Sequence, residues 1–235
     1  MTDSYLSATN LLGFKLSTID DASAGLMDLI LDTERWGVRF LTAEADAWAP
    51  DRDVLIMPSS VAGVNEAERE LELAMEAETL RSSPLVAQDE DLGGLEDGWL
   101  PPAWQAQWRA EMDPEQAVDA PPAPVDETLA EITAELGAEP DLGADRWVRA
   151  SRLRRIACET ADGVSLRITD LLIDDADWEL AYLELTLAPE HAQEDAHSTS
   201  RHLVPRRSID WLNRDTETLH LAITEQELSE AVSPV

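Results

Sequence analysis

The sequence predicts a mainly β protein in which two small β-barrels are joined by an acidic linker with short helices. Two observations lead to this prediction: an internal repeat about 142 residues apart, and many short β-compatible stretches separated by turn residues. The segment 28–36 returns as the segment 170–178, and Leu71-Glu72-Leu73 returns as Leu219-His220-Leu221. Closing short strands into barrels removes exposed sheet edges, which favours this architecture.

The repeat divides the chain into three segments. Residues 1–84 form the first barrel, residues 85–145 the linker, and residues 146–235 the second barrel. A unit of about 80 to 90 residues holds only a marginal core, so we expect the two copies to pack together or against a partner.

Short strands are expected throughout both copies. In the first copy they fall at 12–17, 25–32, 37–44, 54–58 and 70–75. In the second copy they fall at 156–159, 166–174, 180–187, 202–205, 209–213 and 218–223. A C-terminal helix follows, because Thr224 and Glu227 have the spacing of a capping box.

The middle segment has the composition of a linker, with many prolines, 16 acidic residues and a single basic residue. Trp104, Trp108 and Met112 fall on one face of a short helix, and a second short helix follows Asp126. These apolar faces need a cover. Either the segment lies across the two barrels as a strap, or it docks another protein.

The charge balance excludes several functions. With a net charge of −32, binding to nucleic acid or to an anionic membrane surface is opposed by long-range repulsion. The acidity fits either adaptation to a salty, halophilic cytoplasm or a cationic partner. No apolar stretch is long enough to cross a bilayer, the N-terminus has no secretion signal, and Cys158 is the only cysteine. We therefore expect a cytoplasmic protein without disulfides.

One basic island stands out in this acidic chain. It contains Arg146, Arg149, Arg152, Arg154 and Arg155, with Arg206 and Arg207 as candidate neighbours in the fold. These arginines either form ion pairs with the acidic linker or mark the surface where a partner docks.

Other candidate sites have plain structural interpretations. Asp32 with Trp36, and Asp174 with Trp178, occupy matched turns; each pair either forms a ligand-binding lip or stabilises the turn, and we favour the turn. His191, His197 and His202 are weak metal-ligand candidates, because their spacing matches no closed zinc pattern. We predict no cofactor, no catalytic motif, and a packed rather than a reactive Cys158.

Several of these motifs resemble the PRC-barrel family, which is named for the cytoplasmic domain of the photosynthetic reaction centre H subunit. The family also includes the C-terminal domain of a bacterial ribosome-maturation factor. The resemblance rests on Leu12-Gly13-Phe14-Lys15, the run 25–32, Trp36 and the run 54–59. It covers residues 5–84 well and 146–235 adequately, and the second copy departs from it at Arg154-Arg155. The arrangement is similar to tandem PRC-barrel proteins of bacteria.

The resemblance implies a non-enzymatic interaction or assembly module that docks a protein partner. Its most specific version is a peripheral subunit or assembly factor of a membrane complex of the photosynthetic reaction-centre type. Such a protein is cytoplasmic and reaches the inner membrane through its partner, without inserting into it. The alternatives are a ligand- or metal-binding stress-response protein and a ribosome-associated maturation factor, and the acidic charge disfavours the second alternative.

Overall fold

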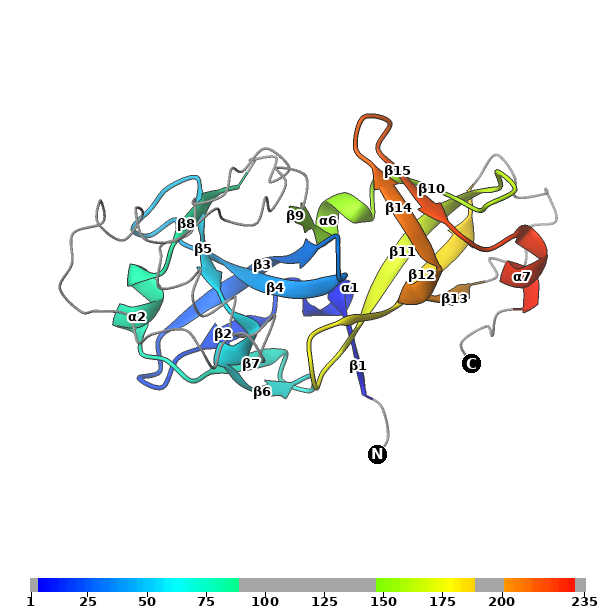
Figure 1. The fold of residues 1–235 in the computed structure, drawn as a ribbon. Coiled ribbons are helices and arrows are strands. Elements are labelled where there is room, and N and C mark those ends of the chain that lie inside the picture. Colours follow the sequence, from blue (N-terminus) through cyan, green and yellow to red (C-terminus); the bar gives the residue numbers. More distant parts are fainter. Residues whose placement is uncertain (1–3, 89–146, 189–200, 231–235) are drawn as a thin grey trace, which may run out of the picture.

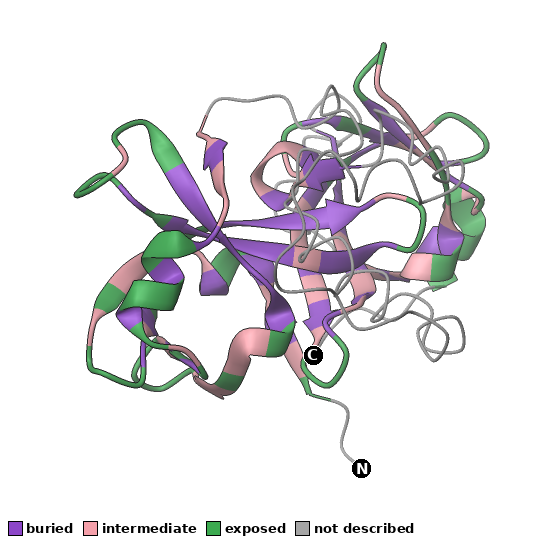
Figure 2. Cartoon of the chain, turned by 60° about the vertical axis from the view of Figure 1, so that its left-hand side comes forward, coloured by how far each residue is buried: buried purple, intermediate pink, exposed green. Residues whose placement is uncertain are grey.

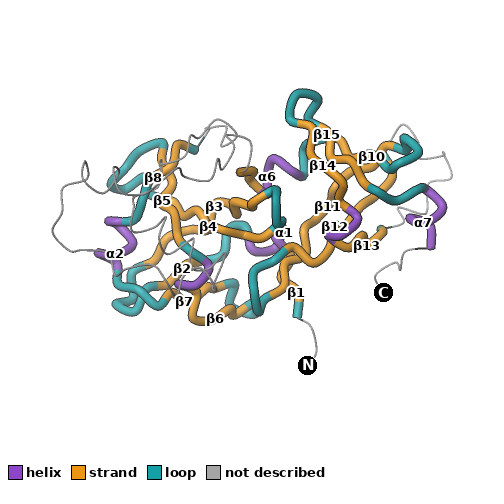
Figure 3. The backbone as a smooth tube through the Cα atoms, viewed as in Figure 1, coloured by secondary structure: helices purple, strands orange, loops and turns teal. Residues whose placement is uncertain are grey.

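The computed structural model describes residues 4–88, 147–188 and 201–230, which form two β domains with short helices (Figures 1 and 3). The predicted mainly β fold class is confirmed, and one of the two sheets is curled into a half-barrel. The elements of the first repeat are β1 (Tyr5–Ser7), α1 (Ala8–Leu11), β2 (Lys15–Ser17), β3 (Ser23–Asp32), β4 (Gly37–Glu44), β5 (Arg52–Ile56), η1 (Pro58–Ser60), β6 (Val61–Asn65), β7 (Glu70–Leu73), α2 (Ala77–Ser82) and β8 (Leu85–Ala87).

The second repeat follows the same plan. Its described elements are β9 (Trp147–Arg149), α6 (Ala150–Leu153), β10 (Ala157–Glu159), β11 (Ser165–Asp174), β12 (Leu180–Leu187), β13 (His202–Pro205), η3 (Arg206–Ser208), β14 (Ile209–Asn213), β15 (Thr218–Leu221) and α7 (Glu225–Glu230).

Two constant offsets relate the repeats. The first offset takes β1 to β9 and β3 to β11, so that Tyr5 corresponds to Trp147 and Ser23 to Ser165. The second is slightly larger, because the loop before β13 is longer in the second copy, and it takes Pro58 of η1 to Arg206 of η3. We call residues related by these offsets equivalent.

The first strand of each repeat belongs to the sheet of the other repeat. β1 lies antiparallel to β11, with Leu6 opposite Ile173. Reciprocally, β9 lies antiparallel to β3, with Val148 opposite Leu31. The order of the first sheet is therefore β6-β7-β2-β3-β4-β5-β8 with β9 added on β3, and that of the second is β13-β12-β11-β10-β15-β14 with β1 added on β11.

A β-bulge in each long strand makes room for the exchanged strand. β3 shifts register between Leu26 and Asp28, and β11 shifts between Ile168 and Asp170. Before the bulge each long strand pairs with its own repeat, through β2 or β10, and after it with the strand from the other repeat. Because a bulge bends and twists a strand, it lets one strand serve both partners.

The exchanged strands also contribute to the core. Leu6 and Val148 are almost fully buried, in one apolar cluster that contains side chains of both domains. In Figure 2 the buried residues, in purple, lie along strands of the sheets. Burying each such side chain contributes about 2 kcal/mol relative to exposure. Cys158 lies in β10 and is also fully buried, as predicted, and burial raises the pKa of its thiol to about 12.

The two tryptophan turns meet between the domains. Asp32 accepts the amide hydrogen of Glu34 at 2.9 Å, and Asp174 accepts that of Ala176 at 2.9 Å, which confirms the predicted turn role of both aspartates. Trp36 and Trp178 are buried in left-handed backbone conformations, with φ of 58° and 60°. The amide of Val38 donates to the Trp178 carbonyl and that of Leu180 to the Trp36 carbonyl, both at 2.8 Å. The turns thereby hold the domains together.

The sequence located most strands but not the exchanged ones. The predicted ranges of β4, β12, β13 and β14 agree with the structure, and Thr224 and Glu227 form the expected capping box, with the Thr224 amide 2.9 Å from Glu227 Oε2. β1, β6, β8 and β9 are not among the predicted strands, and β8 falls in the range expected for the linker. The tryptophan-bearing helix expected at 104–112 lies outside the described residues. Across the described ranges, no helix has the length and apolar character required to cross a membrane.

Candidate functional site

The strand exchange creates two equivalent junctions between the domains. At each junction the aspartate at the β-bulge, Asp170 or Asp28, accepts hydrogen bonds from the exchanged segment, and we call this arrangement the clasp. At the first, the hydroxyl of Ser7 donates to Asp170, and the amide of Thr9 donates to the same carboxylate at 2.9 Å. At the second, the hydroxyl of Ser151 donates to Asp28, and the Ser151 amide also donates to it, at 3.2 Å. Each aspartate therefore anchors the chain just after the exchanged strand, where α1 or α6 begins.

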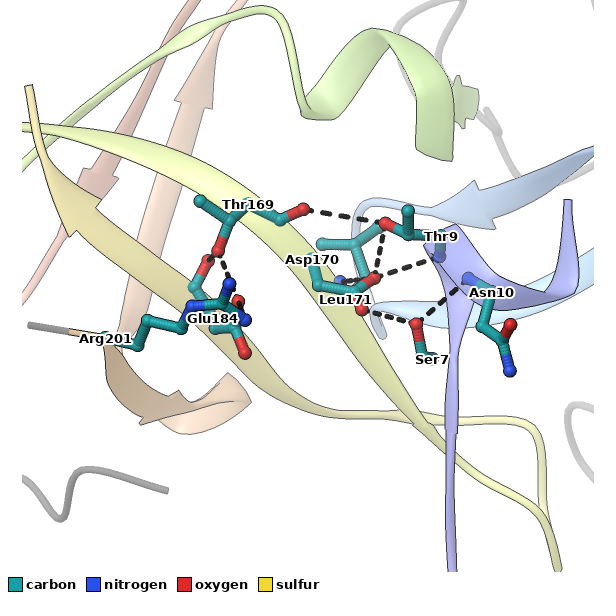
Figure 4. A network of polar contacts seen from close by, with 8 residues as sticks. All are labelled: Ser7, Thr9, Asn10, Thr169, Asp170, Leu171, Glu184 and Arg201. Carbon is teal, nitrogen blue, oxygen red and sulfur yellow. Dashed lines mark hydrogen bonds and ion pairs between the residues drawn. The ribbon is translucent and has the colours of Figure 1, made fainter. Parts of the chain in front are cut away.

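The first junction opens into a polar groove of about 410 Å³. Its walls come from both domains, and Figure 4 shows most of the side chains that form it. The lining residues are Ser7, Thr9, Asn10, Arg69, Thr169, Asp170, Glu184 and Arg201. We take this groove as the candidate functional site.

On the second-domain wall, Glu184 connects two side chains. Its Oε1 accepts a hydrogen bond from the Thr169 hydroxyl at 2.7 Å and forms an ion pair with Arg201 Nη1 at 3.2 Å (Figure 4). The side chain of Arg201 is 63% exposed, so its guanidinium group faces the solvent in the groove. This wall therefore presents the accessible guanidinium group of Arg201, which is held by the carboxylate of Glu184.

On the first-domain wall, Arg69 is held in place. Its Nη1 donates to the Asn10 side-chain oxygen at 2.9 Å, and its Nη2 donates to the carbonyls of Asn10 and Leu12. The guanidinium also lies 4.7 Å from the centre of the Phe14 ring, a cation–π distance. Arg69 therefore presents a fixed positive charge to the groove.

The second junction is filled by an arginine. Arg149 reaches from β9 into the first domain, where its Nη1 lies 3.5 Å from Asp53 Oδ2 and its Nη2 donates to the Ala87 carbonyl at 2.9 Å. Arg149 and Asp53 are both nearly buried, with 11% and 4% of their side chains exposed. Desolvation raises the pKa of Asp53, an effect that Gln88 and Arg149 oppose. Arg152 and Glu217, the equivalents of Asn10 and Arg69, form an ion pair at 2.8 Å.

The structure separates the members of the predicted basic island. Arg149 and Arg152 bind acidic groups of the two repeats, whereas Arg155 is exposed and Arg154 ends α6. Arg206 lies at the tryptophan turns, where it pairs with Glu179 and donates to the Arg35 carbonyl at 2.6 Å.

The remaining predicted site residues fall partly outside the described chain. Trp104, Trp108, Met112, Arg146, His191 and His197 lie in ranges that the structure does not describe. His202 is in β13, opposite Leu185. Within the described ranges, no group of three or more His, Cys, Asp or Glu residues is arranged to hold a metal ion.

Sequence reasoning missed the groove, because its walls come from segments far apart in the chain, such as those that carry Ser7 and Asp170. The usable signal was the repeat itself. Aligning the copies by their two offsets places the neutral Ser7 against Arg149 and the basic Arg201 against the acidic Asp53, so the charge differs between the copies at both positions.

Comparison with known proteins adds no family to this description. No family model matches the chain, and no curated protein matches it. The resemblance to PRC-barrel proteins therefore stays a prediction from the sequence.

Proposed function

We propose that this protein is a non-enzymatic interaction and assembly module that docks another protein through strand β14. The observation that supports this proposal is Trp211, which is 50% exposed at the centre of that strand. Tryptophan is enriched among the residues that dominate binding energy at protein interfaces. A large aromatic side chain left half in water is therefore a natural anchor for a partner.

Trp211 is already ordered for binding. Its ring stacks on that of His220, directly opposite on β15, with centroids 4.4 Å apart and an interplanar angle of 13°. An immobilised side chain loses less conformational entropy when a partner covers it. The equivalent positions in the first repeat are Gly63 and Glu72, so the first domain has no such aromatic pair.

The surroundings of Trp211 favour a basic, extended partner segment. β14 is the terminal strand in the order of the second sheet, and such an edge can accept another strand through backbone hydrogen bonds. The exposed Asp210 adjoins the tryptophan and the exposed Asp215 follows the strand, while Arg207 and Arg214 flank it. The charges beside the strand are therefore mixed, and it is the net charge of −32 over the whole chain that attracts cations.

The family resemblance supplies the most specific version of the proposal. In that version the partner is a subunit of a membrane energy-converting complex such as a photosynthetic reaction centre. The protein is then a cytoplasmic peripheral subunit or assembly factor that stays outside the bilayer.

Affinity purification in native-like salt tests the proposal with three baits: the parent chain, Trp211→Ala and Trp48→Ala. Trp48 is a matched control, because it is 39% exposed in the first domain. We expect the parent and Trp48→Ala to retain a basic partner that Trp211→Ala loses. Equal recovery by all three baits would reject β14 as the docking surface. Recovery of a partner that is not a membrane-complex subunit would reject the reaction-centre version alone.

A further inference from the structure

We propose that the groove at the first junction binds the carboxylate group of a small ligand. The inference is independent of the proposed docking at β14, which lies on another strand. It rests on the internal repeat, because the same position of the fold is seen twice, once filled by the chain's own side chains and once open.

The equivalence of the two junctions is fixed by strand register. Ser7 pairs with Leu172 on β11 as Arg149 pairs with Ile30 on β3, so the serine stands where the arginine stands in the other copy. Asp170 pairs with Glu184 as Asp28 pairs with Thr42. The clasps are retained, and the side chain that fills the second junction is missing from the first.

The charges around the two clasps also differ. The filled junction holds the acids Asp28, Asp53 and Glu217 and the bases Arg149 and Arg152, a balance of one negative charge. The groove holds Asp170, Glu184, Arg69 and Arg201, a balance of zero. A ligand carrying one negative charge would therefore give the groove the same net charge, one negative, that the side chains give the filled junction.

The polar groups in the groove fit a carboxylate. The larger offset relates Arg201 to Asp53, so a guanidinium group replaces a carboxylate and reverses the charge offered to a ligand. A guanidinium has five N–H donors in a fork that matches a carboxylate, and the single described bond of Arg201, to Glu184, leaves the fork accessible. Arg69 adds a fixed positive charge from the opposite wall.

The same groups disfavour other ligand classes. A doubly charged phosphate would bring the groove to a balance of two negative charges, one more than the filled junction has. A cation would bring the groove to a balance of one positive charge, the opposite sign to the filled junction. The groove is also polar, with hydroxyl groups from Ser7, Thr9 and Thr169, so an apolar ligand would leave these groups unpaired.

Titration of the full chain with sodium acetate, followed by nuclear magnetic resonance of arginine side chains, tests this inference. We expect saturable shifts of the Arg69 and Arg201 Nε–Hε signals at millimolar acetate, with sodium chloride at matched ionic strength as the reference. Sodium phosphate should bind more weakly. Identical shifts in acetate and chloride would overturn the proposal.

Two variants locate the effect. Arg201→Gln should weaken acetate binding about tenfold or more, because the planar donor fork is lost. The double variant Ser7→Arg/Arg201→Asp rebuilds the filled junction in the groove and should abolish acetate binding while keeping the parent melting temperature within a few degrees. Arg155→Gln, which removes an exposed arginine outside the groove, is the control and should bind like the parent. Saturable binding that survives in a folded double variant would reject the groove as the site, and a double variant that does not fold leaves the decision to Arg201→Gln.

Discussion

The two junctions between the domains have one backbone geometry and two different sets of side chains. In both, an exchanged strand pairs antiparallel with a bulged strand, and an aspartate at the bulge binds the segment that follows it. At one junction Arg149 and Asp53 fill the space beside the clasp, and at the other a groove remains. The clasp is therefore common to both junctions, whereas the side chains around it form packing at one junction and a binding surface at the other.

Removing the clasp aspartates should give the largest effect and should distinguish the junctions. Asp28 is buried and accepts hydrogen bonds from Ser151 and from the Leu29 amide, whereas Asp170 borders the open groove. Asp28→Ala should lower the free energy of unfolding by about 3 kcal/mol and Asp170→Ala by about 1.5 kcal/mol, since water can reach the groups left unpaired at the groove.

Urea unfolding followed by circular dichroism measures both losses. Glu68→Ala, at an exposed position of the first domain, provides the control and should stay within about 0.5 kcal/mol of the parent. Equal losses for Asp28→Ala and Asp170→Ala would show that solvent access does not distinguish the junctions.

Truncating the equivalent residues Arg149 and Ser7 should also destabilise the protein more at the filled junction than at the groove, and the difference in the free energy of unfolding should be smaller. Arg149→Met leaves the nearly buried Asp53 without its cation and should cost about 2 kcal/mol. Ser7→Ala removes the hydroxyl that donates to Asp170 and accepts from the Asn10 amide at 3.0 Å, and should cost about 1 kcal/mol, since water can replace these bonds at the groove. Chemical denaturation measures both, and Arg155→Met serves as the exposed control. An unchanged free energy of unfolding in Arg149→Met would mean that the ion pair only compensates for the cost of removing Arg149 and Asp53 from water.

The smallest expected effects concern the pH dependence of stability. The contribution of Asp20 and Asp162 should have the opposite sign to that of Asp53. Hydrogen bonds from Thr18 and from the Ala77 amide lower the pKa of Asp20, and those from Thr160 and the Glu225 amide lower the pKa of its equivalent, Asp162. A lowered folded-state pKa contributes stability above the unfolded value of 3.8, and this stability is lost as the pH falls through the folded pKa.

Asp53 should act in the opposite direction. Burial raises its pKa in the folded state, so its protonation favours folding, and stability should increase as the pH falls from above the raised pKa towards 3.8. Carboxyl titration by nuclear magnetic resonance, with urea midpoints from pH 7 to pH 3, measures both trends. Asp162→Asn should remove part of the acid-side loss. An Asp53 pKa below 3.8 would contradict its assignment as desolvated.

The sequence predicted the parts of this fold that local patterns encode. The hairpins of β3 with β4 and of β11 with β12 are long, alternate with clear turns and recur in both copies, so their ranges were found. The exchange was not predictable in this way. β1 and β9 have three residues each, and nothing in Tyr5-Leu6-Ser7 distinguishes pairing with its own repeat from pairing with the other.

The candidate site shows the same limit. Arg149 was noticed because it belongs to a cluster of arginines, but its partner Asp53 is one acid among 49. Ser7 and Arg201 carry no local signal, since the strand exchange alone makes them line one groove. The repeat offsets could have paired them with Arg149 and Asp53, but which copy leaves a groove depends on side-chain volume in the folded chain.

The reciprocal exchange gives this single polypeptide the organisation of a homodimer. Two identical chains that traded their first strands would form a closed assembly with twofold symmetry, and each half would be incomplete alone. Here both halves are covalently linked, so their association does not depend on protein concentration. Covalent linkage also allows the two halves to differ in sequence. A substitution such as serine for arginine then changes one interface and leaves its counterpart intact.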